Sequence, residues 1–144
     1  MPLWKVYHPV DAFSDADKQV LAEQITDLYT RLPRFYVGVL FFEVPKQSFF
    51  MSGTPTDKFV RINIDHIAIN NIPADRKAWW IENINKVLAP FVKDRGFSWE
   101  FHIDETLRDL WSIQGFVPPP ANSEAENRWK AENKPTAYEL LPSS

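Results

Sequence analysis

The stretch Met1-Pro2-Leu3-Trp4-Lys5-Val6-Tyr7-His8 decides how this chain is organised. Its side chains alternate, with Leu3, Lys5 and Tyr7 on one face and Trp4 and Val6 on the other, which predicts a β-strand. A strand that begins at once ties the chain terminus into a sheet and prevents it from fraying. The sequence therefore predicts an N-terminus that is held at a fixed place.

Pro2 could give this fixed terminus a group for acid–base chemistry. A small residue behind the initiator methionine permits removal of Met1, which would leave Pro2 as a secondary amine on a rigid ring. An amine at a fixed place can act as a general acid or base. The alternative is that proline is common after Met1 and carries no function here.

Composition limits the classes of protein to which the chain can belong. The 144 residues predict one domain, and a hydrophobic content of 44% with 15% aromatic residues is enough for a packed core. A net charge of −3 without a basic run gives no sign of a nucleic-acid surface, and the lack of cysteine excludes disulfides and thiolate metal sites. The chain has no apolar run of membrane-spanning length and no signal peptide. We expect a cytoplasmic protein without a metal or other cofactor.

The first half of the chain follows a strand–helix–strand order. Ser14 and Asp17 form the signature of a capping box, and helical spacing predicts a helix from Asp15 to Arg31, ended by Pro33. The β-branched and aromatic run Phe35–Val44 predicts a strand buried on both faces. A short edge piece at Phe49–Met51 precedes turn residues.

The second half repeats this order. Phe59–Ile67 alternates as a strand, Pro73 suits the start of a helix that kinks or ends near Ala89, and Phe97–Ile103 alternates as a further strand. The sequence thus predicts an α/β (α+β) fold made of a duplicated β-α-β unit, with repeats at residues 1–54 and 58–104. Parallel strands within each unit give a four-stranded mixed sheet with two helices on one face.

The other face of this sheet has nothing in the chain to cover it. We expect it to be apolar, through Val37 and Val39 or their alternates, and to be covered by other subunits. After the domain at residues 1–120, a C-terminal arm at residues 121–144 carries a short helix from Ser123 to Ala131 with Trp129 on it. We expect the arm to pack on the domain or on a neighbouring subunit.

These features together resemble the tautomerase superfamily, whose members use an N-terminal proline as acid or base. Glu43-Val44-Pro45-Lys46, followed by Phe49 and Gly53, is similar to a stretch of 4-oxalocrotonate tautomerase. The fused length and Ile25-Thr26-Asp27 resemble the cis-3-chloroacrylic acid dehalogenase subgroup, and the tail through Gly115–Pro120 resembles its uncharacterised fungal members. The resemblance implies a homotrimer with three active sites near subunit contacts.

The chain departs from the subgroup at the residues that carry dehalogenation. The positions of carboxylate-binding arginines in the family read Phe13 and Gly38, and the segment 65–72, where the dehalogenases carry two arginines, has none. Tyr29 replaces a histidine of the dehalogenases, His102 replaces their catalytic tyrosine, and Ile113 replaces their water-activating glutamate. Dehalogenation by the same machinery is not expected.

The candidate site residues follow from chemistry and position. Pro2 is the expected proton-transfer group, with burial among Trp4, Phe49 and Phe50 lowering its pKa. His102 or Tyr29 would polarise a substrate oxygen. Arg61, Phe49 and His66 are the candidates for substrate binding, Arg61 through a bidentate contact to a carboxylate. The alternatives are a strand histidine at His102, a core tyrosine at Tyr29, a structural His66 and a surface ion pair at Arg61.

The sequence predicts a proline-based tautomerase or isomerase that moves a proton on a small carbonyl or enol compound such as a 2-oxo acid. One alternative is the addition of water to an unsaturated acid, as in a hydratase or dehalogenase. Another is a trimeric binding or scaffold protein that kept the fold without catalysis. Fold by itself does not decide between these functions.

Overall fold

The computed structural model describes residues 1–69 and 71–139. Its strands and helices are, in chain order, β1 (Pro2–Pro9), α1 (Asp15–Asp27), β2 (Gly38–Val44), β3 (Phe50–Met51), β4 (Thr54–Pro55), β5 (Phe59–Ile67), α2 (Ala74–Leu88), β6 (Ser98–Thr106) and α3 (Glu124–Glu132). Four single turns of 3₁₀ helix lie between them, at Arg34–Tyr36, Lys46–Ser48, Lys93–Arg95 and Arg108–Leu110.

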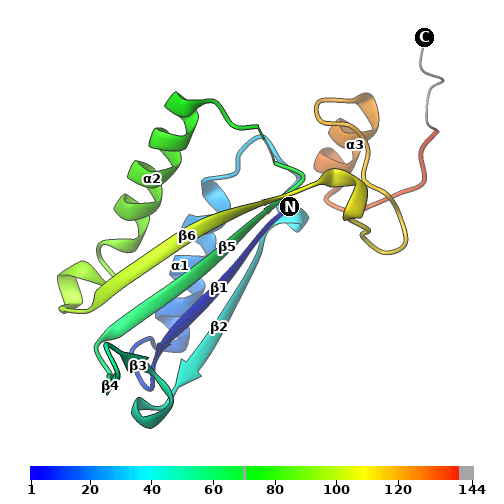
Figure 1. Cartoon of the computed structure of the whole chain (residues 1–144). Coiled ribbons are helices and arrows are strands. Elements are labelled where there is room, and N and C mark those ends of the chain that lie inside the picture. The colour runs from blue at the N-terminus through cyan, green and yellow to red at the C-terminus, as the bar shows by residue number, and fades with distance from the viewer. Residues whose placement is uncertain (70, 140–144) are drawn as a thin grey trace.

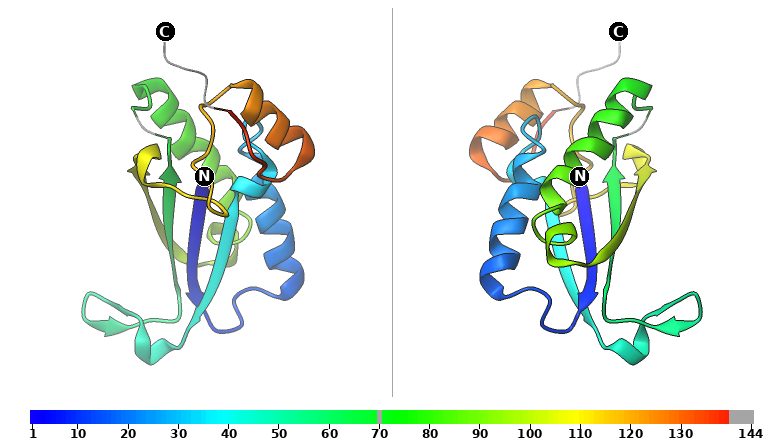
Figure 2. Two further views of the ribbon diagram at one scale, coloured as in Figure 1. Left: turned by 90° about the vertical axis from the view of Figure 1, so that its right-hand side faces the viewer. Right: turned by 90° about the vertical axis from the view of Figure 1, so that its left-hand side faces the viewer.

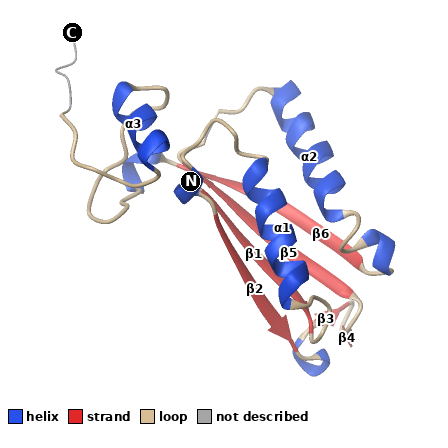
Figure 3. Cartoon of the chain, turned by 180° about the vertical axis from the view of Figure 1, so that it is seen from behind, coloured by secondary structure: helices blue, strands red, loops and turns tan. Residues whose placement is uncertain are grey.

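The main sheet has the strand order β2-β1-β5-β6. β2 runs parallel to β1 and β6 runs parallel to β5, whereas the two central strands β1 and β5 are antiparallel (Figure 1). α1 and α2 both lie against one face of this sheet, as the view from behind shows (Figure 3). The predicted duplicated β-α-β unit and its four-stranded mixed sheet are therefore confirmed.

The core lies between the sheet and these two helices. Trp4 and Val6 of β1 and Val60, Ile62 and Ile64 of β5 are fully buried, as the alternation predicted. They meet Leu21 and Ile25 of α1 and Trp80, Ile84 and Leu88 of α2. Each such side chain contributes about 1.5–3 kcal/mol by leaving water. This packing fixes β1, and with it the chain terminus, at the centre of the sheet.

The other face of the sheet, the open face, is not apolar throughout, which corrects our expectation. Leu40 and Phe42 of β2 lie on it and are 44% and 41% exposed. Lys5, Arg61 and His102 share the face through the strand register. The prediction that β2 is buried on both faces is also wrong, because β2 is an edge strand and its outward side chains have no helix above them.

Two boundaries differ from the predictions around Pro33. α1 ends at Asp27, and the Leu28 and Tyr29 amides then donate to Ile25 and Thr26 in tighter turns. The strand predicted from Phe35 begins only at Gly38, since Arg34–Tyr36 forms a 3₁₀ turn behind Pro33. A proline disfavours helical geometry in the residue before it and cannot donate to a ladder. Both elements are therefore shorter than their side-chain patterns.

The predicted edge piece forms a small hairpin. β3 and β4 pair antiparallel around Ser52 and Gly53, whose φ angles are 53° and 73°. Two consecutive positive φ angles match the twist of a tight hairpin, and glycine adopts this geometry at little cost.

The C-terminal segment packs on the end of the sheet at which the chain begins (Figure 2). Trp129 of α3 is fully buried there, with Tyr36 and Trp111. We call this group the tail cluster; Met1, Leu32, Phe35, Ile67, Ala68, Ile113, Phe116 and Tyr138 pack around it. Residues 140–144 of the predicted arm lie outside the described residues. Within the described chain, no helix is long and apolar enough to cross a membrane.

Candidate active site at the chain terminus

Pro2 lies at the buried start of β1, directly opposite His66 of β5. Met1 and Ile67 exchange both of their main-chain hydrogen bonds, the Ile67 amide donating to the Met1 oxygen over 2.8 Å. Pro2 and His66 are therefore a non-hydrogen-bonded pair, the kind in which opposing side chains lie closest. A proline fits this position because the ladder needs no amide donor there.

A chain of buried hydrogen bonds fixes His66. The Trp4 indole Nε1 donates to the Tyr29 hydroxyl over 3.0 Å, and that hydroxyl lies 2.8 Å from His66 Nε2. If the tyrosine donates its own proton to Nε2, the imidazole carries its proton on Nδ1. This arrangement leaves only the Nδ1 proton of His66 without a partner. If His66 instead donated from Nε2 to the hydroxyl, both Nδ1 and the tyrosine proton would lack one. Nδ1 is buried and has no partner among residues 1–69 and 71–139.

Burial shifts the titration of the groups at this end of the sheet. The pKa of His66 falls to about 4 because burial disfavours the imidazolium and because the N-terminal charge lies nearby. Burial likewise lowers the pKa of the Met1 amine to about 5, although the Glu126 carboxylate opposes this. The Met1 amine is thus largely neutral at pH 7.

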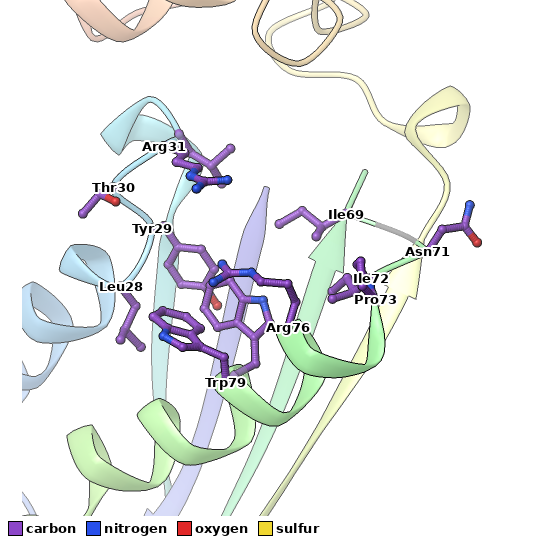
Figure 4. Close-up of a pocket in the computed structure, with 12 residues that line it drawn as sticks. Leu28, Tyr29, Thr30, Arg31, Ile69, Asn71, Ile72, Pro73, Arg76 and Trp79 are labelled. Atoms are coloured by element: carbon purple, nitrogen blue, oxygen red, sulfur yellow. The ribbon is translucent and has the colours of Figure 1, made fainter.

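A pocket opens between the end of α1 and the start of α2, beside this hydrogen-bonded chain. Its volume is about 580 Å³, and Tyr29, Ile69, Trp79 and Trp80 are among its walls. Figure 4 shows Tyr29, Arg76 and Trp79 gathered between the two helices. We call it the helix-side pocket. The aromatic walls give it the apolar character that small organic ligands prefer.

Two arginines supply positive charge to this pocket. Arg31 and Arg76 both line it, and the Arg76 guanidinium lies 4.5 Å from the centre of the Trp79 ring. Neither arginine has an acidic partner in the described part of the chain. A guanidinium stacked on an aromatic ring keeps its edge free for a carboxylate. The pocket is therefore suited to an anion.

The tail cluster brings further polar groups to the chain terminus. Tyr36 is 1% exposed, and its hydroxyl has no hydrogen-bond partner within the described residues. Burial and the Glu126 carboxylate raise the pKa of this phenol, which therefore stays protonated. Arg108 donates from Nη2 to the Pro118 oxygen, while its buried Nε is unpartnered among the same residues.

Three of the predicted site residues lie together at the terminus, and the other three, Phe49, Arg61 and His102, line a second pocket of about 580 Å³. Pro2, Tyr29 and His66 meet at the terminus, as described. Arg61 and His102 are on the open face, where Arg61 Nη2 donates to His102 Nδ1 and His102 Nε2 lies 3.1 Å from Asp104 Oδ2. Phe49 packs on Phe59, at the opposite end of β5 from His66.

This placement changes the expected surroundings of Pro2. Phe49 and Phe50 do not bury Pro2 within the chain, because seven strand positions separate Phe59 from His66 on β5. At about 3.3 Å per residue this is more than 20 Å. The burial of the terminus comes instead from the core and from the tail cluster. The Tyr29 hydroxyl contacts Trp4 and His66, and its predicted role toward a substrate oxygen stays a prediction.

Sequence reasoning missed Arg31, Arg76, Tyr36 and Arg108. Arg76 has a local signal, because it follows Pro73 in the first turn of a predicted helix, shortly after the segment 65–72. Tyr36 and Arg108 carry no local signal, since only the folded tail brings them to the terminus.

Comparisons with known proteins agree with this fold. The family described as "Putative oxalocrotonate tautomerase enzyme" matches residues 1–134. RhCC from Rhodococcus jostii RHA1 is 45% identical, with a TM-score of 0.91 over 94% of this chain and 99% of that one. A structure from Aspergillus fumigatus is 36% identical, with a TM-score of 0.91 over 96% and 98%. N1, a member of the cis-3-chloroacrylic acid dehalogenase family, is 17% identical, with a TM-score of 0.73 over 91% and 97%. No curated protein matches the chain.

Proposed function

Because this chain belongs to the tautomerase family that matches residues 1–134, we propose that it is a proline-based tautomerase for a small 2-oxo acid or its enol. In this proposal Met1 is removed and Pro2 becomes the acid–base group. The single observation that carries the proposal is the placement of Pro2, which is buried at the start of β1 directly opposite His66 of β5. Burial disfavours a cation, so an amine on Pro2 at this place would have a lowered pKa and could act as a base at neutral pH.

The proton transfer needs nothing beyond the chain. The neutral proline amine takes a proton from the carbon beside the carbonyl and becomes a cation, leaving an enolate. The cation returns the same proton to carbon or to oxygen, so no redox partner or cofactor takes part. A neutral His66 with its proton on Nδ1 supports this chemistry as a donor next to Pro2, and Tyr29 is its positioning residue.

The arginines of the helix-side pocket support a carboxylate on the substrate. Arg31 and Arg76 are unpaired by acids in the described chain and face a pocket with aromatic walls. They would supply the charge that the family positions at Phe13 and Gly38 lack. Arg61 is a weaker candidate, since it is engaged by His102 and by the carbonyl oxygens of Ile62 and Glu100.

A trimer belongs to the same proposal. Fused 4-oxalocrotonate tautomerases with this fold form trimers, one of them 19% identical to this chain with a TM-score of 0.65. Leu40 and Phe42 leave half-exposed apolar surface on the open face, which other copies of the chain would cover.

The test is an intact mass of the tag-free protein together with the conversion of phenylpyruvate enol to ketone. Pro2→Ala is expected to lower kcat/KM more than about a hundredfold, the range that general acid–base groups contribute. Pro45→Ala is the matched control, because Pro45 is exposed and far from the terminus. A retained Met1, or activity indifferent to Pro2, would favour a non-catalytic trimer.

The pH profile separates the tautomerase from water addition. A base with a lowered pKa keeps kcat/KM high at neutral pH and loses it as the pH falls through that value. Water addition with Pro2 as general acid needs the cation and gives the opposite slope.

A further inference from the structure

Glu126 is a buried carboxylate of the C-terminal segment. It lies in the first turn of α3 and is only 7% exposed, whereas Glu124 in the same turn is exposed. Among residues 1–69 and 71–139 it has no ion-pair partner. A carboxylate loses water on burial and is rarely buried unless it is paired. Its place in the interior therefore needs an explanation.

Helix capping explains the position of this side chain but not its charge. Glu126 Oε1 accepts a hydrogen bond from the Asn122 amide over 3.1 Å, and the Glu126 amide donates to Ser123 Oγ over 3.2 Å. Both bonds hold the carboxylate at the start of α3. A glutamine would accept from the Asn122 amide equally well, without the cost of burying a charge. The cap therefore gives no reason for a negative charge at this place.

Glu126 lies on the face of α3 that packs toward the start of β1. Trp129 follows Glu126 by three residues and so shares its face of the helix. Trp129 is fully buried in the tail cluster, and Met1 packs against that cluster. Figure 1 shows α3 beside the N-terminus of the chain. The fold thus brings a carboxylate from near the end of the chain close to the terminal amine.

The charge of Glu126 acts on this amine. Burial lowers the pKa of the Met1 amine to about 5, and the Glu126 carboxylate opposes this shift. The Pro2 nitrogen is three covalent bonds from the Met1 nitrogen and therefore less than about 4 Å away. The same carboxylate would act on an amine at either residue, so the argument holds for a terminus at Met1 or at Pro2.

We propose that Glu126 is an electrostatic positioning residue, which stabilises the cation that the terminal amine forms during proton transfer. The role in the reaction rests on the proposed function. As the substrate carbon–hydrogen bond breaks, its electron pair moves toward the carbonyl oxygen and the proton forms a bond to the amine nitrogen. The proton later leaves the nitrogen for carbon or oxygen, and Glu126 takes no proton at any stage. A nearby negative charge makes the buried amine a stronger base than burial alone would leave it.

A pair of isosteric variants separates the charge from the cap. Glu126→Gln removes the buried charge and keeps the acceptor for the Asn122 amide, whereas Glu124→Gln removes an exposed charge from the same turn. The rate at which a low concentration of acetic anhydride acylates the terminal amine follows its neutral fraction, and mass spectrometry measures it across a range of pH. We expect the midpoint of this profile to fall by about half a pH unit or more in Glu126→Gln and to stay unchanged in Glu124→Gln. The other titratable groups at this end of the sheet are the same in both variants: Tyr36, His66, Arg108 and Tyr138.

The reaction supplies a second readout. With phenylpyruvate enol as substrate, the loss of kcat/KM at acid pH should move to lower pH in Glu126→Gln, and kcat/KM at neutral pH should fall about threefold because the amine is a weaker base. Glu126→Asp keeps the charge and is expected to have a midpoint between those of Glu126→Gln and wild type. Thermal unfolding establishes that each variant is folded, and Glu126→Met replaces Glu126→Gln if the latter is not.

The outcomes for the two proposals can be told apart. Equal acylation midpoints in Glu126→Gln and Glu124→Gln overturn the inference while leaving the role of Pro2 in proton transfer intact, even if kcat/KM falls. A shifted midpoint with unchanged kcat/KM overturns the part of Glu126 in the reaction. Activity that survives in Pro2→Ala overturns the proposed function, whereas a shifted midpoint in Glu126→Gln still supports the action of this carboxylate on the terminal amine.

Discussion

Arg76 is a half-buried charge that stacks on an aromatic ring without an acid to balance it in the described chain. If it holds the substrate carboxylate before and during the reaction, Arg76→Gln should raise KM about tenfold and leave kcat within about threefold. Steady-state kinetics with phenylpyruvate enol measures both constants. Arg34→Gln is the matched control, because Arg34 is exposed and pairs with Asp27. A lowered kcat with an unchanged KM would contradict a binding role.

Tyr29 contributes to stability through both of its hydrogen bonds. Tyr29→Phe would leave the buried Trp4 Nε1 without an acceptor and His66 Nε2 without a donor. We expect the free energy of unfolding to fall by about 2 kcal/mol, as for other unsatisfied buried groups. Urea denaturation measures this, with Tyr7→Phe as the control. A loss below about 0.5 kcal/mol would mean that water satisfies these groups.

His66 makes the stability of the protein depend on pH. Its folded pKa of about 4 lies below the ordinary value of 6.5, so the unfolded chain binds the proton more tightly. Stability is complete above pH 6.5 and is lost as the pH falls toward 4, by about 3 kcal/mol for this group. Urea denaturation at pH 7 and pH 4 should show a loss about 3 kcal/mol smaller in His66→Asn. His102→Asn is the control, and an equal loss in both variants would contradict the assignment.

Asp17 ties the start of α1 to the segment after α2. Its two carboxylate oxygens each accept a hydrogen bond of 3.0 Å from Arg95, and one of them also caps the Ser14 amide. These bonds, Arg95 first, hold the pKa of Asp17 well below its usual range. The stabilisation is therefore present above the unfolded pKa near 4 and is lost as the pH falls.

We expect Asp17→Asn to lower the midpoint of thermal unfolding at pH 7 and to lower it less at pH 3. Asp15→Asn is the matched control, since Asp15 lies in the same helical turn and has no ion-pair partner in the described chain. A difference that is as large at pH 3 as at pH 7 would show that the ion pair is not responsible.

The elements could be predicted where local pattern and packing agree. β1, β5 and β6 alternate because helices cover one face, and the Ser14–Asp17 box starts α1 as expected. The start of β2 could not be placed, because the burial of Tyr36 under the tail holds Arg34–Tyr36 in a 3₁₀ turn, and the local sequence does not report this packing.

The candidate site, too, could be predicted from the sequence only in part. Pro2 and His66 face each other because strand register follows from the hydrophobic pattern. His102 lies on the opposite face of the sheet from His66, because their positions on paired strands differ by an odd number. Phe49 and Pro2 lie at opposite ends of the sheet. Arg31 and Arg76 come together only through the packing at the ends of α1 and α2, and Tyr36 is buried only through the packing of the tail; no local pattern reports either.

The whole molecule carries apolar surface on a face that its own helices do not cover (Figure 1). If copies of the chain pack on it, the protein should sediment at three times the 16.8 kDa chain mass. Phe42→Glu would place a charge in this contact and is expected to yield monomers. Val20→Glu, at a similarly exposed position on α1, should remain a trimer.

Sedimentation velocity at micromolar concentration measures these masses. The glutamate of Phe42→Glu would be buried in the contact between copies, whereas that of Val20→Glu would stay in solvent. Only the Phe42 variant should therefore dissociate. A wild-type monomer, or a trimer that tolerates Phe42→Glu, would contradict assembly through this face. Activity in a monomeric variant would further show that Pro2 and His66, which one chain brings together, work without a partner subunit.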